Sequence, residues 1–156
     1  MKSNFERMIQ LADDVFASKN DSEQLDVDES ILEGLGKIHP ACVSEYDDGN
    51  GPVAWVLMFP TTKKLMELFL AKNISEKQLY ESTPLGEAYD VIYLCSAMVL
   101  EEHRSKGIAT RLALNSIEQI RKDHMIESLF VWAFTIEGRR LSSELANFLS
   151  LPIIFR

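Results

Sequence analysis

The chain has 156 residues, of which 46% are apolar and 26% are charged, and its formal net charge is -8. This composition excludes a disordered or fibrous protein, and the length predicts one globular domain over residues 1–156. The negative charge argues against a nucleic-acid or anionic-membrane partner, and the longest apolar run, Val53–Phe59, is far shorter than the roughly 20 residues of a membrane span.

The first part of the chain predicts two helices. Ser3 and Glu6 form a capping box ahead of apolar residues that recur at helical spacing over residues 5–16. A second, short helix has apolar residues on one face from Ile31 onward. Its apolar face extends to Ile38, and we expect Gly36 and Pro40 to end the helix.

Two strands follow these helices. Residues 41–46 and 53–59 read as strands, and the Asp, Gly and Asn residues at 47–51 between them have the composition of a hairpin loop. Pro60 and Thr61 are predicted to stop the second strand.

The rest of the chain alternates between helices and strands. The predicted elements are two short helices (65–72 and one capped by Ser75), a central strand (90–100), a long helix (107–122), a strand (128–134), a helix (141–149) and a short strand (152–155). This order, with its strand–helix–strand unit, predicts an α/β or α+β fold with a mixed sheet flanked by helices.

Acidic residues concentrate between Asp13 and Glu33. That window holds eight acidic residues against Lys19 alone, so it carries -7 of the net charge of -8. The simplest interpretation is the solvated outer face of two helices. The alternative is a negative rim that attracts a cationic substrate.

The segment after the central strand has the features of an anion site. A short polar loop leads into a helix that opens at Gly107. The first amides of a helix have no intrahelical partner and lie at its positive end, so a phosphate can accept several N–H bonds there. Gly107 allows close approach to the backbone, and Arg104 and Lys106 add positive charge. The segment contains neither a Walker A run nor a Rossmann fingerprint.

Residues 104–109 resemble motif A of the GNAT superfamily of acyl-CoA-dependent N-acyltransferases, Gln/Arg-x-x-Gly-x-Gly/Ala. They stand as Arg-Ser-Lys-Gly-Ile-Ala, with a strand before them and a long helix, a strand and another helix after them. The resemblance covers residues 90–148. It implies a GNAT-like mixed sheet and an acetyltransferase that moves an acyl group from acetyl-CoA to a primary amine.

The resemblance also implies where acetyl-CoA binds. The pyrophosphate would lie on the loop and helix amides of Arg104, Ser105, Lys106, Gly107, Ile108, Ala109 and Thr110. The pantetheine arm would pair as an added pseudo-strand with Met98, Val99 and Leu100. A backbone N–H of that strand would polarise the acyl carbonyl. No metal is implied.

The implied chemistry is direct attack of an amine on a thioester. An alkylammonium has a pKa of about 10.4, so a base must remove its proton first. Family members often carry a tyrosine as general acid in the helix after the fifth strand, where this chain has Ser142, Ser143 and Glu144. Tyr93, on the central strand, is our candidate for proton transfer, and a buried structural tyrosine is the alternative.

Two other functions stay open. One is a non-catalytic CoA-binding or regulatory module, and the other is a structural α/β protein without a nucleotide site. If the acidic window borders the acceptor cleft, it favours cationic acceptors such as polyamines, aminoglycoside-like amines or lysine-bearing peptides. Cys42 and Cys95 predict reduced thiols in a cytoplasmic protein. The sequence leaves a homodimer open.

Overall fold

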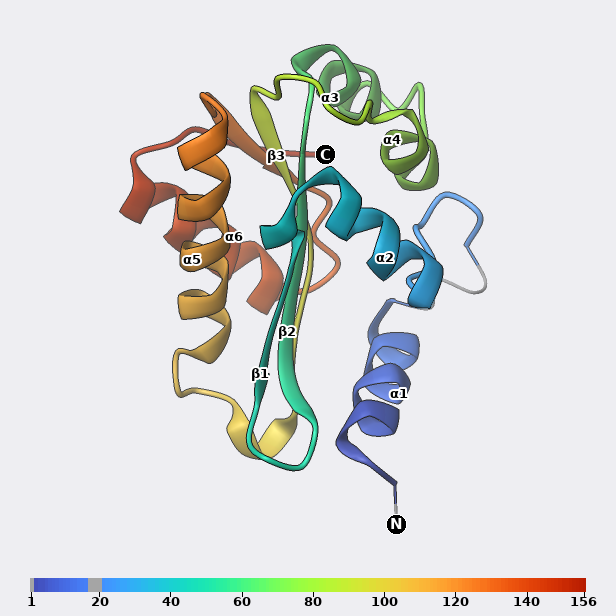
Figure 1. The fold of residues 1–156 in the computed structure, drawn as a ribbon, viewed down its shortest axis with the longest axis vertical. Coiled ribbons are helices and arrows are strands. Elements are labelled where there is room, and N and C mark those ends of the chain that lie inside the picture. Colours follow the sequence, from blue (N-terminus) through green and yellow to red (C-terminus); the bar gives the residue numbers. More distant parts are fainter. Residues whose placement is uncertain (1, 17–20) are drawn as a thin grey trace.

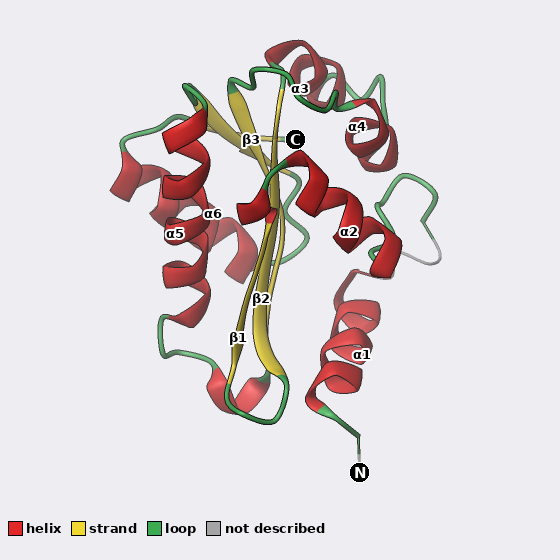
Figure 2. Cartoon of the chain, viewed as in Figure 1, coloured by secondary structure: helices red, strands yellow, loops and turns green. Residues whose placement is uncertain are grey.

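The structure is a computed structural model that describes residues 2–16 and 21–156; Lys19 and the side chains of Val15 and Phe16 lie outside the described residues. The described part forms, in chain order, α1 (Asn4–Phe16), α2 (Glu29–Ile38), the 3₁₀ turn η2 (Pro40–Cys42), β1 (Val43–Asp47), β2 (Pro52–Thr61), α3 (Lys63–Leu70), α4 (Glu76–Ser82), β3 (Val91–Val99), the 3₁₀ turn η3 (Glu101–His103), α5 (Ile108–Asp123), β4 (Ser128–Val131), α6 (Ile136–Leu149) and β5 (Ile153–Phe155). Figure 2 shows how helices and strands alternate.

The strands form one mixed sheet in the order β1-β2-β3-β4-β5. β1, β2 and β3 are antiparallel neighbours, whereas β4 and β5 continue the sheet in parallel with β3. In Figure 1 the sheet is seen from its edge, with α1 and α2 on one side and α5 and α6 on the other. The predicted mixed sheet flanked by helices is therefore confirmed.

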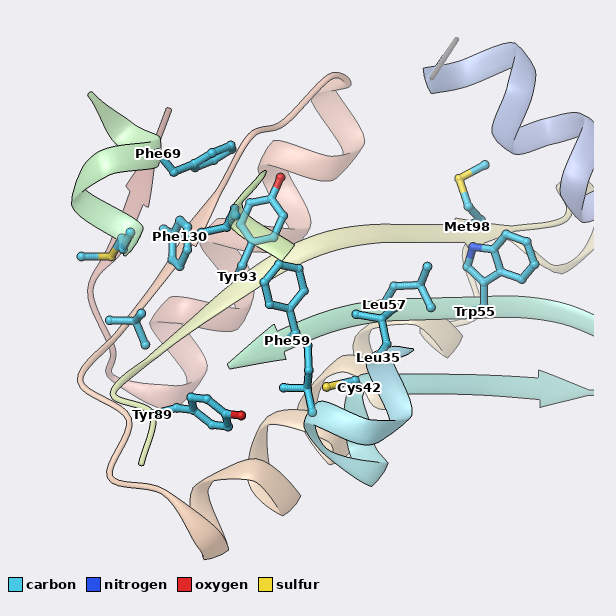
Figure 3. Packing of buried hydrophobic residues seen from close by; sticks show 14 of the residues in the cluster. Leu35, Cys42, Trp55, Leu57, Phe59, Phe69, Tyr89, Tyr93, Met98 and Phe130 are labelled. Atoms are coloured by element: carbon cyan, nitrogen blue, oxygen red, sulfur yellow. The ribbon is translucent and has the colours of Figure 1, made fainter. Parts of the chain in front are cut away.

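Both faces of the sheet are covered by hydrophobic cores. On the side of α1 to α4, the ring of Tyr93 packs against Phe59, Phe69 and Phe130 at centroid distances of 5.4, 5.2 and 5.0 Å (Figure 3). On the opposite side, α5 and α6 bury their apolar faces against β2, β3 and β4. Because β3 is central and covered twice, its residues are apolar on both faces.

The predicted capping box of the first helix is confirmed, whereas α6 starts at Ile136, ahead of the predicted residue 141, and Gly36 does not end the second helix. The Ser3 amide donates to the Glu6 carboxylate at 3.0 Å, and the Glu6 amide donates to the Ser3 hydroxyl at 3.1 Å. Helix α2, however, continues through Gly36 to Ile38. Burial of Leu35 and Ile38 against the sheet stabilises this last turn, and tertiary packing outweighs the low helix propensity of one glycine.

The prediction that Pro60 and Thr61 stop the second strand is also wrong. β2 runs through Pro60, which lies opposite Ile92 of β3. β1 pairs with β2 only as far as Leu57, so among the described residues β2 has a strand on one side only beyond that point. Proline is tolerated on such an edge because its missing N–H breaks no ladder bond.

β4 is shorter than the predicted strand over residues 128–134. It pairs with β3 at four positions, from Val91–Ser128 to Leu94–Val131, and then ends. The apolar pattern continues because Trp132 still packs in the core, against Phe69 at a ring distance of 6.1 Å. Past Leu94, β3 therefore has a strand partner only in β2, as far as the described residues go.

Candidate active site

The divergence of β3 and β4 leaves a cleft of about 70 Å³, which we call the interstrand cleft. Residues 94–97 of β3 line one side and residues 131–135 line the other. Side chains of α5 and α6, among them Ala113 and Leu141, close it from below the sheet. A narrow cleft beside an unpaired strand edge is suited to an extended ligand that pairs with the strand backbone.

Part of the β3 backbone is directed away from β2, toward the interstrand cleft. The amide of Leu100 donates to β2 at 2.8 Å. The backbone N–H and C=O groups of successive strand residues point in alternate directions within the sheet. Those of Met98 therefore also point toward β2, whereas those of Ala97 and Val99 point toward the open edge. The carbonyl of Val99 accepts from Nε of Arg104 at 3.0 Å. Of the residues predicted for the pantetheine arm, Val99 thus faces the open edge, and Ala97 is one that the sequence analysis missed.

The loop before α5 has an exposed, uncapped helix start. Ser105 and Gly107 adopt left-handed backbone conformations, with φ of 64° and 74°. Gly107 is the N-cap, and no side chain caps the helix, so the amides of residues 108–110 lack an intrahelical acceptor. Arg104 and Lys106 are exposed beside them. Left-handed residues before a helix start form an anion-binding concavity, and these cations add to its field.

Burial varies along the residues predicted for the pyrophosphate. Arg104, Ser105, Lys106 and Gly107 are exposed, Ala109 and Thr110 are half-buried, and Ile108 is buried. A Cβ built at Gly107 would meet nothing within 4 Å, so the space in front of the helix start is open. The structure therefore brings the predicted loop residues together around an accessible site.

A larger cavity of about 300 Å³ lies between the sheet and helices α1 and α2. We call it the acidic cavity, because its lining holds five carboxylates and, among the described residues, no Lys, Arg or His. These carboxylates are Asp13, Asp26, Asp28, Glu29 and Glu76. The other walls are mainly apolar, with Phe5, Leu32 and Trp55 among them. Four of the five acids come from the window that the sequence analysis singled out.

The two cavities meet at the middle of β3. They share four lining residues: Leu57, Cys95, Ser96 and Phe134. Leu57 lies opposite Ser96 and the next β2 residue lies opposite Leu94, so Cys95 is the extra residue of a β-bulge. A molecule in the acidic cavity and a molecule in the interstrand cleft would therefore approach each other at this bulge.

The acidic cavity contains a buried acid that the sequence analysis missed. Glu76 is the first residue of α4 and is 5% exposed. One of its carboxylate oxygens accepts from the amide of Leu25 at 2.6 Å, and the other accepts from the hydroxyl of Tyr93. Burial raises the pKa of Glu76, and the hydrogen bonds from Tyr93 and Leu25 oppose that rise. In the sequence Glu76 only follows the capping residue Ser75, which indicates a helix start and not burial.

Tyr93 contacts the acidic cavity through its hydrogen bond to Glu76. Its side chain is fully buried among aromatic rings (Figure 3) and lines neither cavity, as far as the described residues define them. Burial and the neighbouring Glu76 raise the pKa of Tyr93 well above its ordinary value, so its hydroxyl keeps its proton and donates.

Helix α6, which follows β4, offers no tyrosine. The hydroxyl of Ser142 lines the interstrand cleft but donates to the Gly138 carbonyl of its own helix at 2.8 Å. Ser143 is half-buried and Glu144 is exposed. The hydroxyl that faces the cleft is therefore already engaged within α6.

Metal ligands do not gather in the part of the chain that the structure describes: no three His, Cys, Asp or Glu side chains are placed to hold an ion. None of its described helices is both long enough and apolar enough to cross a membrane. Cys42 and Cys95 are free thiols, as the sequence predicts.

One protein family and two solved structures are similar to this chain. Residues 5–140 match the model of the acetyltransferase (GNAT) family. Among solved structures, the chain is similar to Arabidopsis thaliana NAA60 in complex with acetyl-CoA, at 17% identity and a TM-score of 0.53, over 92% of this chain and 80% of that one. It is also similar to ribosomal-protein-alanine N-acetyltransferase from Brucella melitensis biovar Abortus 2308, at 15% identity and a TM-score of 0.43, over 88% and 83% of the two chains.

No curated protein matches the chain. At identities this low, the likeness to NAA60 establishes the fold alone, and it confirms the predicted GNAT-like sheet. The family match extends over most of the sequence, and it confirms the predicted acetyltransferase at the level of the family. The chain belongs to the acetyltransferase (GNAT) family.

Proposed function

We propose that this protein transfers an acetyl group from acetyl-CoA to a primary amine by direct attack of the amine on the thioester. One observation carries the proposal: the uncapped start of α5 lies just beyond the end of β3, whose edge past Leu94 has no strand partner on the β4 side among the described residues. An acyl-CoA needs both features, because its pyrophosphate is an anion and its pantetheine arm is an extended chain with amide groups.

The residues present fit acetyl-CoA. The amides from Ser105 to Thr110 would hold the pyrophosphate, since the Arg104 amide already donates to the Glu101 carbonyl at 3.2 Å. The side chains of Arg104 and Lys106 would add charge-assisted hydrogen bonds. The arm would lie along residues 97–100, where the backbone groups of Val99 face the open edge. The acetyl-CoA complex of the structurally similar NAA60 supports this choice of donor.

The acidic cavity is the proposed acceptor site. Its carboxylates would attract a cationic amine, and its apolar walls would hold the carbon chain next to that amine. Polyamines, aminoglycoside-like amines and lysine-bearing peptides share this chemistry. Holding the amine against the thioester at the Cys95 bulge would supply much of the rate by proximity.

Binding of acetyl-CoA, followed by calorimetry, tests the donor site. Arg104→Glu should weaken binding at least tenfold, because the reversed charge repels the pyrophosphate. Arg121→Glu is the matched control, since it makes the same charge change on the exposed surface of α5, about 20 Å further along the helix. Equal affinities for the two variants would contradict the proposed site.

Release of the free CoA thiol with a panel of amines tests the transfer. Turnover with at least one cationic amine is expected. Tight binding without release across the panel would favour the non-catalytic CoA-binding module, and absence of binding would favour a structural protein.

A further inference from the structure

We propose that Glu76 accepts the proton that the acceptor ammonium must lose before it attacks the thioester, and that Tyr93 and the Leu25 amide hold the carboxylate in position. The inference deepens the proposed transferase function and rests on it. It assigns the catalytic proton transfer to a residue of α4, outside the strand–loop–helix segment that carries the acyl-CoA features.

The position of Glu76 separates it from the other acids of the acidic cavity. Asp26, Asp28 and Glu29 are exposed at the rim, and Asp13 is half-buried. Glu76 alone among these lining acids is buried, at 5% exposure, and it shares the cavity with the Cys95 bulge. The rim acids are thus placed to attract a cation, whereas Glu76 is placed to meet the amine beside the thioester.

Glu76 is held by three hydrogen bonds, two at its carboxylate and one at its backbone amide. Its two oxygens accept from the Leu25 amide and the Tyr93 hydroxyl, and its own backbone amide donates to the carbonyl of Glu23 at 2.8 Å. Tyr93 is itself fixed by three aromatic rings. An ionised carboxylate has about four acceptor sites, so two remain for the N–H groups of an ammonium.

The surroundings of Glu76 favour a carboxylate that can bind a proton. Burial raises its pKa, and the charge of Asp21 acts in the same direction, whereas the Arg156 guanidinium opposes it. A base with a raised pKa accepts a proton more readily at neutral pH than an exposed carboxylate does. Burial and Glu76 raise the pKa of the Cys95 thiol well above its ordinary value, so that thiol stays neutral and does not compete as a base.

The step balances without a further reactant. The ammonium gives one proton to the Glu76 carboxylate, and the nitrogen lone pair forms a C–N bond with the thioester carbonyl carbon. The C–S bond then breaks, its electron pair leaves with sulfur, and the second nitrogen proton ends on the CoA thiolate. Glu76 returns its proton to solvent. The products are an amide, CoA thiol and one released proton.

Glu76→Gln tests the assignment, because glutamine has the same size and accepts no proton. Its amide oxygen can still accept from the Leu25 amide, and its NH2 group can donate to the Tyr93 oxygen. With an alkylammonium acceptor at pH 7, kcat should fall about 100- to 10,000-fold, while the Kd for acetyl-CoA stays unchanged. With an amine of low pKa, already neutral at pH 7, the fall should be much smaller. Glu81→Gln, on the exposed part of the same helix, is the matched control and should keep wild-type kcat.

Tyr93→Phe gives an independent readout and decides the matter if Glu76→Gln shows no cooperative melting. In the wild type, the hydrogen bond from Tyr93 lowers the pKa of Glu76. The variant loses this bond, so the pKa of Glu76 should rise and the acid limb of the kcat profile should move to higher pH. The plateau above that limb should be largely kept. A merely structural tyrosine would leave that limb in place.

The outcomes separate the two proposals. Wild-type turnover together with an undiminished Glu76→Gln, an equal loss with both kinds of amine, or an unmoved acid limb in Tyr93→Phe would overturn the assignment alone. Wild-type protein that binds acetyl-CoA and releases no CoA thiol with any amine would overturn the transferase function and the assignment with it.

Discussion

Replacing Gly107 by alanine should cost little stability but weaken acetyl-CoA binding strongly. Gly107 has φ of 74°, in the left-handed region, where an alanine is less stable than glycine by about 1 kcal/mol. A Cβ there would meet nothing within 4 Å, so no clash adds to this penalty. For a domain of this size, about 1 kcal/mol lowers the melting temperature by roughly 2–4 °C.

The effect on acetyl-CoA has a different origin. The new methyl group would stand in the open space in front of α5, where the pyrophosphate is proposed to approach the amides. Loss of one charge-assisted hydrogen bond there removes about 1.5–3 kcal/mol. The Kd for acetyl-CoA should therefore rise about tenfold to a hundredfold.

Gly86→Ala is the matched control for this prediction. Gly86 has φ of 73° and equally open surroundings, but it lies before β3, at the opposite end of that strand from Gly107. Thermal melting should show the same small loss of stability in both variants. Calorimetry should show weakened acetyl-CoA binding only in Gly107→Ala, and equal Kd values for the two variants would refute the proposed pyrophosphate site at the start of α5.

Three further outcomes are expected. The Arg7 guanidinium lowers the pKa of Glu102 to about 2. The stability from this pair is therefore fully present above about pH 4.5 and is lost as the pH falls toward 2. The difference in melting temperature between wild type and Arg7→Met should shrink to zero over that range, and a constant difference would contradict the pairing. Asp26→Asn combined with Glu29→Gln should raise KM for a cationic acceptor, most at low ionic strength, whereas an unchanged KM would exclude the rim acids from acceptor binding. Burial raises the pKa of the Cys42 thiol to about 12, so a thiol reagent at pH 8 should leave it unmodified until the protein is unfolded, as mass spectrometry of the labelled residues can show.

The part of the site that the sequence predicts well is encoded locally. Ser3 and Glu6 lie three residues apart, and the glycine that opens a helix after a buried strand is likewise recognised from residues close to it in the sequence. The N-cap role of Gly107 and the uncapped start of α5 follow from such neighbours, and the structure agrees with them.

The parts that the sequence could not predict depend on distant partners. Glu76 is buried because the Leu25 amide, 51 residues away, and the Tyr93 hydroxyl, 17 residues away, satisfy its oxygens. β4 ends at Val131 because its pairing with β3 ends there. The apolar residues continue through Phe134, so the sequence pattern does not indicate where the strand ends. Strand ends and buried polar pairs are decided by tertiary contacts that no local pattern contains.

Net charge alone would have argued against an anionic ligand, since the chain carries -8. In the structure the carboxylates of the acidic cavity and the cations before α5 come from different elements, although Glu101 and Glu102 also precede Arg104. Acidic side chains line the cavity beside α1 and α2, whereas Arg104, Lys106 and the positive end of α5 lie beyond β3. At an ionic strength near 0.1 M, charges act over about 10 Å. Under the proposed function each ligand would respond to the charges beside it, so a protein that is acidic as a whole could hold a polyanionic donor and a cationic acceptor in one reaction.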